Sequence, residues 1–345
     1  LIVRTSLDFD LQNQVQCAAE FHLSRLADPV NSGLPPASCP AGNLLPAVVS
    51  SPGEGSNLAA NVVVLDHTSG EILALVGNPP GMTGLLARRP AGTLLTPLIY
   101  LTAFTRGMGP ASLVWDIPDS QPEPQIENLD GRYHGPLRLR QALANDYLVP
   151  ALQIYAQVGP GNVWRTAAQM GLPGLGDLES ASAPQQDPRS SFLQSPANLL
   201  ELSRAYAILA NQGSQAEIRL ETGSEGRPEA SPLAGALLLS VQTNQGKTLL
   251  KDTPPLQRPV LTPGLAYLLT HILSDESARW PSLGHPNPLD TGRPAAAKLG
   301  QTLQEQDAWA LGYTPQRVVG VWVGAQDAQP APEPDQNPVP PGAAA

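Results

Sequence analysis

The segment from residue 92 to residue 97, with the letters GTLLTP, carries two hydroxyl side chains at a spacing that suits acyl transfer. A hydroxyl that opens a helix can attack a carbonyl carbon if a base within hydrogen-bond reach takes its proton. A lysine three residues after the nucleophile would be such a base. Here Thr93 carries the first hydroxyl, and Thr96, three residues later, accepts no proton near neutral pH. The segment therefore holds a possible nucleophile without a base at that spacing.

Few other residues could supply the base, because the chain has only three lysines, Lys247, Lys251 and Lys298. The segment from Thr248 to Lys251 repeats the spacing of a hydroxyl and a lysine. It is predicted on a strand after a tight turn at 244–246 and does not open a helix. We therefore do not assign it a catalytic role.

Composition restricts the classes of function. The 345 residues carry a net charge of −10 with a pI near 4.9, and only 14% are charged. A nucleic-acid-binding surface needs a basic stripe, which this sequence lacks, and binding to an anionic membrane surface is disfavoured for the same reason. No run of about 20 apolar residues is present, so no membrane span is expected. The start at Leu1, without a methionine or a signal peptide, suggests a fragment of a longer protein.

The pattern of apolar residues predicts helices and strands that alternate in blocks. Two strands near the N-terminus and three near the C-terminus enclose a helical middle, which indicates a mixed sheet covered by helices, with the two ends of the chain meeting in the sheet. One predicted helix begins at 6–8. The other predicted helices cover 93–107, 196–211, 265–274 and 138–171, the last with stops at Gly159 and Gly171. The predicted strands are 61–66, 71–77, 238–241, 248–251, 295–300, 307–313 and 318–324, and the rest of 214–260 is expected to be variable.

Three segments are expected along the chain. Residues 1–57 would form an N-terminal helix and a linker rich in proline, glycine and serine. Residues 58–327 would form the main domain. Residues 328–345 are rich in proline and alanine without an apolar pattern, so a disordered tail is expected there.

Cysteine, histidine and acidic residues give weaker signals. Cys17 and Cys39 could form a short-loop disulfide in an exported protein or remain free thiols, and the sequence leaves both open. The five histidines have no metal-ligand spacing, so neither a metal nor a cofactor is expected. The acidic residues between Asp116 and Asp130 could suggest a pair of glycosidase carboxylates, but a solvated loop is favoured.

Five strings, taken together, resemble one protein family. They are NVVVLD at 61–66, TSGEILALVG at 68–77, NLDGRYHGP at 128–136, LRQALA at 139–144 and DAWALGYTPQRVVGVWVG at 307–324. Their order and spacing are similar to the transpeptidase domain of class A penicillin-binding proteins, of the 1C type, over residues 5–327. The resemblance implies the penicilloyl-serine transferase, or β-lactamase-like, fold: an α+β fold with a mainly antiparallel five-stranded sheet between helical layers.

The family's first two catalytic motifs are altered in this chain. Its Gly-Ser-x-x-Lys-Pro motif aligns Thr93 with the serine nucleophile and Thr96 with the lysine base. Its Ser-x-Asn motif aligns Asp146 with the hydroxyl that relays a proton and Leu148 with the amide that orients the substrate. The resemblance further implies that the carboxylate of Asp146 would repel the carboxylate of an acyl-D-Ala-D-Ala substrate.

The third motif, Lys-Thr/Ser-Gly, is partly retained. Lys298 and Gly300 match it, whereas Leu299 replaces the hydroxyl that would bind the substrate carboxylate. The following residues are Gln301, whose backbone N–H could serve an oxyanion hole with that of Thr93, and Thr302. The family geometry would bring Lys298 close to Thr93.

The resemblance therefore implies a catalytically degenerate transpeptidase domain of a peptidoglycan synthase, kept as a structural, docking or peptidoglycan-binding module. The alternative is a residual D,D-transpeptidase or β-lactam-binding acyl transferase that uses Thr93 with Lys298. Expected partners are peptidoglycan or its stem peptide, cell-wall synthesis proteins and an upstream glycosyltransferase domain in the same chain. The expected location is the outer face of a bacterial cytoplasmic membrane, with the anchor in a missing N-terminal segment.

Overall fold

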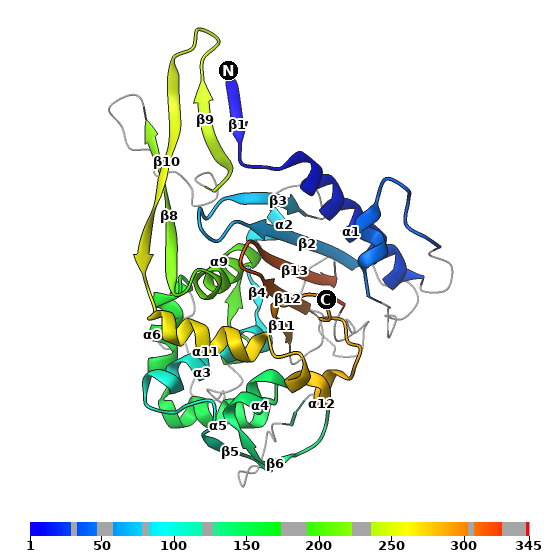
Figure 1. Ribbon diagram of the computed structural model, residues 1–345, viewed down its shortest axis with the longest axis vertical. Helices are drawn as coiled ribbons and strands as arrows, with labels where there is room; N and C mark the ends of the chain where they lie inside the picture. The colour runs from blue at the N-terminus through cyan, green and yellow to red at the C-terminus, as the bar shows by residue number, and fades with distance from the viewer. Residues whose placement is uncertain are drawn as a thin grey trace.

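A five-stranded antiparallel sheet forms the centre of the fold. The computed structural model describes residues 1–28, 33–46, 58–77, 83–118, 127–128, 130–173, 192–222, 236–302, 307–325 and 343–344. The strands lie in the order β11-β12-β13-β2-β3, so the N-terminal pair joins the C-terminal three, as the sequence pattern predicts (Figure 1). Their bounds are β2 (Leu58–Leu65), β3 (Ile72–Val76), β11 (Ala296–Gln301), β12 (Asp307–Tyr313) and β13 (Val318–Ala325).

Strand β13 is the central strand of this sheet, and it pairs with β2. All residues of β2 after Leu58 are buried, which fits its near-continuous run of β-branched and small apolar residues. The register places Trp322 opposite Asn61 and Val318 opposite Leu65. Among the described strands, β11 is first in the order and pairs only with β12, so it is an edge strand of the sheet.

A second sheet, which the sequence pattern predicts only in part, extends from the first (Figure 1). It has the order β1-β9-β10-β8, with β1 (Ile2–Thr5), β8 (Ser214–Thr222), β9 (Leu238–Gln242) and β10 (Thr248–Pro259). The predicted hairpin at 238–251 is present. The prediction of a variable stretch for the rest of 214–260 is wrong for β8 and for the second half of β10. The alternating apolar residues of β8, Ala216, Ile218 and Leu220, were the available signal.

The N-terminal helix covers one face of the five-stranded sheet. Helix α1 (Phe9–Ala27) begins at Asp8, whose Oδ1 accepts the backbone N–H groups of Asp10 and Leu11 at 3.1 Å each. It packs against β3 and β2. A disulfide joins Cys17 in α1 to Cys39, just before the short helix η1 (Pro40–Leu44), with the Cα atoms 5.9 Å apart.

The other face of the sheet carries the helical layer. Helix α3 (Thr96–Thr105) follows the 3-10 turn η2 (Gly92–Leu95) and is buried from Thr96 to Phe104, which explains why it is apolar on all sides. Helix α9 (Leu199–Ala210) packs on β2, β12 and β13, and α11 (Pro263–Leu273) packs on β11. The remaining elements are α2 (Thr83–Leu86), α4 (Leu139–Ala144), α5 (Leu148–Val158), α6 (Pro160–Gln169), η4 (Ser277–Arg279), α12 (Trp280–Leu283), β4 (Arg89–Pro90) with β7 (Pro196–Ala197), and β5 (Leu113–Asp116) with β6 (Gly135–Arg138).

The C-terminal range 328–345 is described only at Ala343 and Ala344. Both are buried, and the carbonyl oxygen of Ala343 lies 2.9 Å from Nε2 of His22 in α1. The rest of the range for which a disordered tail is predicted lies outside the described residues. Within the described part of the chain, every helix is too short or too polar to cross a membrane.

Candidate active site

Two glycines bring the start of the helical layer into contact with the edge strand β11. Gly92 has φ +56°, and a Cβ atom there would lie 2.1 Å from the carbonyl oxygen of Gln301. A Cβ on Gly300 would lie 2.4 Å from Cγ of Leu94. Only residues without side chains allow this approach. It sets Thr93 of η2 against Lys298 and Gln301 of β11.

The hydroxyl of Thr93 is occupied by its neighbours. It donates a hydrogen bond to Oδ2 of Asp146 at 2.6 Å and accepts from the backbone N–H of Gln301 at 3.2 Å. Nζ of Lys298 lies 3.5 Å away and also donates to it. Thr93 is 1% exposed. A hydroxyl has one donor and two acceptor sites, so the described contacts use all three.

Asp146 contacts Thr93, Thr96 and Lys298. It lies in the turn between α4 and α5 with φ 55°, a left-handed conformation that is uncommon for a residue with a side chain. Its Oδ2 also forms an ion pair with Nζ of Lys298 at 2.6 Å. Its Oδ1 accepts a 3.3 Å hydrogen bond from Thr96, whose hydroxyl is shared with the carbonyl oxygen of Thr93 at 2.9 Å. Thr96 therefore contributes a hydrogen bond to the arrangement.

Lys298 is a buried ammonium that donates to three oxygens. It is 4% exposed, and besides Asp146 and Thr93 it contacts the carbonyl oxygen of Leu299 at 2.6 Å. Burial lowers the pKa of Lys298, and the neighbouring charge and hydrogen bond of Asp146 oppose that shift. An ammonium that donates to Thr93 has no lone pair with which to take the threonine proton.

The other residues expected at the site take different places. Leu299 lines the cavity beside the site, and the N–H of Gln301 donates to Thr93 instead of facing open space. Leu148 is 1% exposed and packs in the core at the start of α5. The hydroxyl of Thr302 accepts from the N–H of Asp307 at 3.3 Å. Neither Leu148 nor Thr302 lines the cavity.

The cavity has a volume of about 340 Å³ and lies along the open side of β11. Its walls come from β11, from the turn after α4, from the end of α11 and from the segment around α12. Most of the lining is apolar, and the charged side chains among it are Asp130, Asp146, Asp275, Arg279 and Lys298. A pocket of this kind suits a small ligand.

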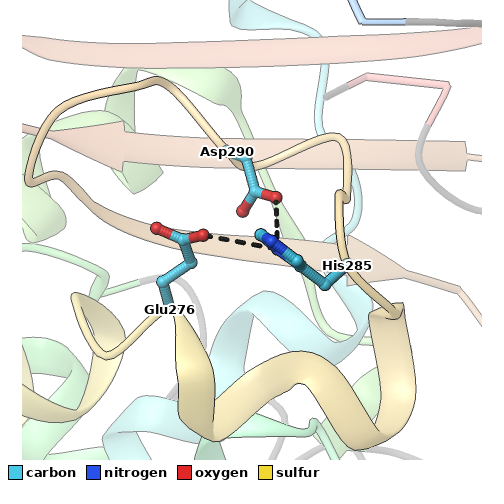
Figure 2. Close-up of side chains that lie close together, drawn as sticks. All are labelled: Glu276, His285 and Asp290. Carbon is cyan, nitrogen blue, oxygen red and sulfur yellow. Dashed lines mark ion pairs between the residues drawn. The ribbon is translucent and has the colours of Figure 1, made fainter.

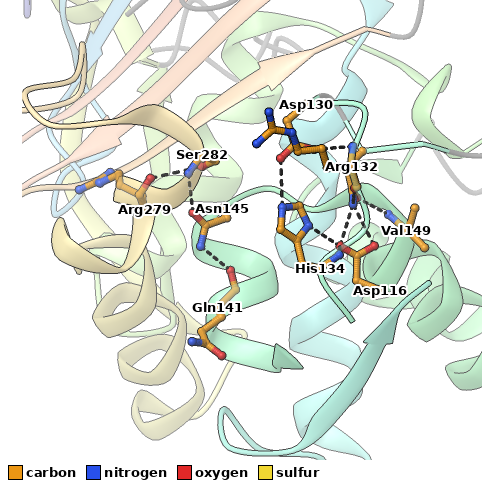
Figure 3. A network of polar contacts seen from close by, with 10 residues as sticks. Asp116, Asp130, Arg132, His134, Gln141, Asn145, Val149, Arg279 and Ser282 are labelled. Atoms are coloured by element: carbon orange, nitrogen blue, oxygen red, sulfur yellow. Dashed lines mark hydrogen bonds and ion pairs between the residues drawn. The ribbon is translucent and has the colours of Figure 1, made fainter. Parts of the chain in front are cut away.

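A buried polar network, which the sequence does not predict, supports one wall of the cavity (Figure 3). The carboxylate of Asp116 is fully buried and accepts from Nδ2 of Asn128 at 2.8 and 2.9 Å. Nδ1 of His134 lies 2.6 Å from Asp116, and its Nε2 lies 3.1 Å from Asp130. The His134 ring stacks on Tyr147, next to Asp146, with centroids 3.9 Å apart. The interpretation of residues 116–130 as a solvated acidic loop is therefore wrong for Asp116. Asp119 and Glu123 lie outside the described residues.

A second histidine lies between two carboxylates on the surface (Figure 2). Nδ1 of His285 is 3.7 Å from Glu276 and 3.5 Å from Asp290. The side chains of His285 and Glu276 are about half exposed. We treat this cluster as a surface ion-pair group, since no second feature marks it as a ligand site.

Comparison with known proteins identifies relatives of the chain and of its fold. No family model matches the chain. Among curated proteins, the chain is 27% identical to penicillin-binding protein 1C of Escherichia coli over 279 residues, 78% of this chain and 31% of the relative. It is 29% identical to penicillin-binding protein 1B of the same organism over 296 residues, 80% of this chain and 31% of the relative. The chain is homologous to class A penicillin-binding proteins. It spans about a third of the length of the curated relatives it matches.

Solved structures show the fold of the homologues. Penicillin-binding protein PonA1 of Mycobacterium tuberculosis superposes with a TM-score of 0.69 and 21% identity, covering 95% of this chain and 78% of that one. The transpeptidase domain of Burkholderia pseudomallei penicillin-binding protein 3 superposes with a TM-score of 0.63 and 16% identity, covering 94% and 88%. The fold is that of penicillin-binding-protein transpeptidase domains, the penicilloyl-serine transferase fold.

Proposed function

We propose that this chain is a catalytically degenerate transpeptidase-like domain of a peptidoglycan synthase, kept as a structural, docking or peptidoglycan-binding module. The observation that carries the proposal is the hydrogen bonding of Thr93. Its hydroxyl donates to Asp146 and accepts from Gln301 and Lys298, and it is almost fully buried. A nucleophile needs a free lone pair aimed at the substrate carbonyl, and these contacts oppose that.

Two further features support the loss of acyl transfer. The position three residues after Thr93 holds Thr96, and Lys298 donates hydrogen bonds to the oxygens around it. The N–H of Gln301, which would stabilise an oxyanion, is used by the hydroxyl of Thr93. A preorganised pair of free N–H donors supplies much of the rate enhancement in acyl transfer, so its occupation weakens catalysis further.

The alternative is a residual acyl transferase or β-lactam-binding protein that uses Thr93 with Lys298. The 3.5 Å separation of Nζ and Oγ1 favours it, because a proton could pass between these atoms if Lys298 were neutral. Burial, which lowers the pKa of Lys298, acts in the same direction. The ion pair with Asp146 acts against it, since Asp146 stabilises the ammonium form.

The wider setting is part of the same proposal. We place the transpeptidase-like unit at residues 58–327, preceded by the helix and linker of 1–57. Because relatives about three times as long share this region, we propose a glycosyltransferase domain upstream in the same chain and cell-wall synthesis proteins as partners. We further propose a position outside the bacterial cytoplasmic membrane, with anchoring through a preceding segment.

Intact mass after long incubation with a panel of β-lactams tests the proposal. Wild type and Thr93→Ala are compared, and penicillin-binding protein A of M. tuberculosis, which has been solved as an imipenem acyl-enzyme complex, serves as the positive control. We expect no adduct on either variant. An adduct on wild type that is absent from Thr93→Ala would overturn the proposal and establish Thr93 as a nucleophile. Binding to purified peptidoglycan, measured by co-sedimentation, tests the retained binding role separately.

A further inference from the structure

Three large apolar side chains are exposed in a row along strand β5. Leu113 is 66% exposed, Trp115 is 57% exposed, and Ile117, just after the strand, is 45% exposed. Successive side chains of a strand point to opposite faces, so Leu113 and Trp115 share one face, and Ile117 continues the alternation. Single exposed apolar residues are common on protein surfaces, but a contiguous row of them marks a site of interaction.

The face that carries this row also carries a positive charge. Strand β5 pairs with β6 in a two-stranded ribbon, in which Trp115 is opposite Pro136 and Leu113 is opposite Arg138. Directly opposite residues of an antiparallel pair project from the same face, and both Pro136 and Arg138 are exposed. Together with Ile117, these four side chains form what we call the ribbon face. It contains no acidic side chain, although the chain as a whole has a net charge of −10.

The opposite face of the ribbon is fixed to the domain. The fully buried carboxylate of Asp116 accepts from Nδ2 of Asn128 and, at 3.0 Å, from the backbone N–H of His134 (Figure 3). At the start of the ribbon, the backbone N–H of Leu139 donates to the carbonyl oxygen of Ser112 at 2.9 Å. The ribbon face is therefore a rigid platform, and a surface that is ordered in advance loses little conformational entropy when a ligand binds.

The size of the ribbon face favours a linear polymer over a folded protein as its partner. Strands β5 and β6 have four residues each. At about 3.3 Å per residue, the face is about 13 Å long, and it is only two strands wide. A stable interface between folded proteins buries about 800 Å² on each side, far more than this face offers. A single extended chain needs only a row of contacts, and Figure 1 shows the ribbon at the end of the molecule away from the second sheet.

The chemistry of the ribbon face favours a sugar polymer with acidic groups. The face of an indole ring is negative, so the C–H groups of a sugar ring pack well on Trp115. The exposed guanidinium of Arg138, about two residues away along the ribbon, is suited to a carboxylate. The positive charge of the face thus complements an anionic glycan.

We propose that the ribbon face binds a glycan strand of peptidoglycan, with Trp115 stacked on a sugar ring and Arg138 paired with a carboxylate of the strand. Carboxylates of muramic acid or of the stem peptides make such strands anionic. This inference deepens the peptidoglycan-binding role proposed above and rests on it. The residues of the ribbon face do not line the cavity along β11, so the proposal is independent of that cavity and of any reaction at Thr93.

Calorimetric titration with two matched probes tests the proposal. The first probe is a preparation of peptidoglycan glycan strands freed of stem peptides, which exposes the carboxylates of muramic acid. The second is the same preparation after its carboxylates have been converted to amides. We expect wild type to bind the acidic strands at least tenfold more tightly than the amidated ones, with a difference that shrinks as salt is added. No binding of the acidic strands, or equal binding of the two probes, would overturn the proposal.

Variants of the ribbon face identify the contacts. Trp115→Ala should weaken binding of the acidic strands at least tenfold, and Trp115→Phe, which keeps an aromatic face, should weaken it less. Arg138→Gln should remove the preference for acidic over amidated strands. The matched control is Trp280→Ala, which removes another exposed tryptophan, 42% exposed, and should leave binding unchanged. Unchanged binding in a folded Trp115→Ala would overturn the assignment.

The result is separable from that of the proposed function. If Trp115→Ala co-sediments with intact peptidoglycan as well as wild type does, the binding role stands and the ribbon face is not its site. If Trp115→Ala binds strands normally but loses a cell-wall protein that wild type retains, the ribbon face docks a protein and the proposal fails. Acylation of wild type by a β-lactam would instead disprove the inactivity of Thr93 and leave the glycan result standing.

Discussion

Oδ2 of Asp146 and Nζ of Lys298 lie 2.6 Å apart, and the same carboxylate oxygen accepts a hydrogen bond from the hydroxyl of Thr93. One side chain therefore pairs with the charge of Lys298 and accepts a hydrogen bond from the hydroxyl of Thr93. Asp146 thereby supplies a charged partner for a lysine that is 4% exposed.

The ion pair gives a prediction for stability. Asp146→Asn leaves the buried ammonium of Lys298 unpaired, and loss of one partner of a buried pair costs about 3–5 kcal/mol. Adding Lys298→Met should recover much of that loss. Urea unfolding of the two single variants and the double variant measures the coupling. Additive effects would mean that the pair contributes little in solution.

Gly92 should be irreplaceable for steric reasons. Gly92→Ala would set a Cβ 2.1 Å from the carbonyl oxygen of Gln301 at φ +56°, so we expect a loss of at least about 2 kcal/mol from strain and overpacking. Gly107→Ala is the matched control, since Gly107 has φ +92° with no atom near its Cβ position. A similar cost at both sites would show that the backbone conformation alone, and not the contact with β11, sets the requirement.

Acid should weaken the link between α4 and the end of α11. Burial raises the pKa of Asp275, but the hydrogen bonds from Ser277, Arg140 and Ala278 and the charge of Arg140 outweigh it, so the folded pKa is below 3.8. A depressed carboxyl pKa stabilises the fold above the unfolded value, and this contribution is lost as pH falls through the folded pKa. Asp275→Asn should lose stability at pH 7 and show a smaller difference from wild type near pH 3. An unchanged difference at both values would contradict this.

Restoring the first motif alone should not restore activity. Thr93→Ser with Thr96→Lys should give little acylation by penicillin, because Asp146, Leu148 and Leu299 remain. A lysine at 96 would also meet the carboxylate of Asp146, which lies 3.3 Å from the present Thr96 hydroxyl. Adding Asp146→Ser should increase acylation, measured as penicillin adduct by mass spectrometry. Rapid acylation of the double variant would show that the other motifs matter little.

Most of the fold could be predicted from the sequence. The β-branched run of β2 and the alternation of β13 are strong strand signals, and the helix after Gly92 is mostly apolar. Strand β1 could not be predicted, because its four residues are all exposed and their pairing with β9 is set by a segment more than 200 residues away. Strand β8 had a weak alternating signal among glycine- and proline-rich neighbours.

The positions of the site residues could be predicted from the sequence, but the contacts between their side chains could be predicted only in part. Alignment of the motifs identified Thr93, Asp146 and Lys298, which the structure brings together. That Asp146 would bind Lys298 depends on its left-handed backbone, which turns its side chain inwards and leaves no trace in the sequence. Arg279 and the pair of Asp116 with His134 were missed, because their contacts join segments that share no motif.

The pairing of β2 with β13 has a consequence for how the chain folds. Asn61 and Trp322 are opposite each other across the middle of the central sheet, so that sheet stays incomplete until β13 has been synthesised, more than 250 residues after β2. Pairings between such distant segments carry a large loop-closure entropy and slow the folding of a domain. Until β13 arrives, the apolar surface of β2 has only β3 beside it in the sheet. Such exposed apolar surface and an unpaired strand edge make a partly synthesised chain prone to aggregation.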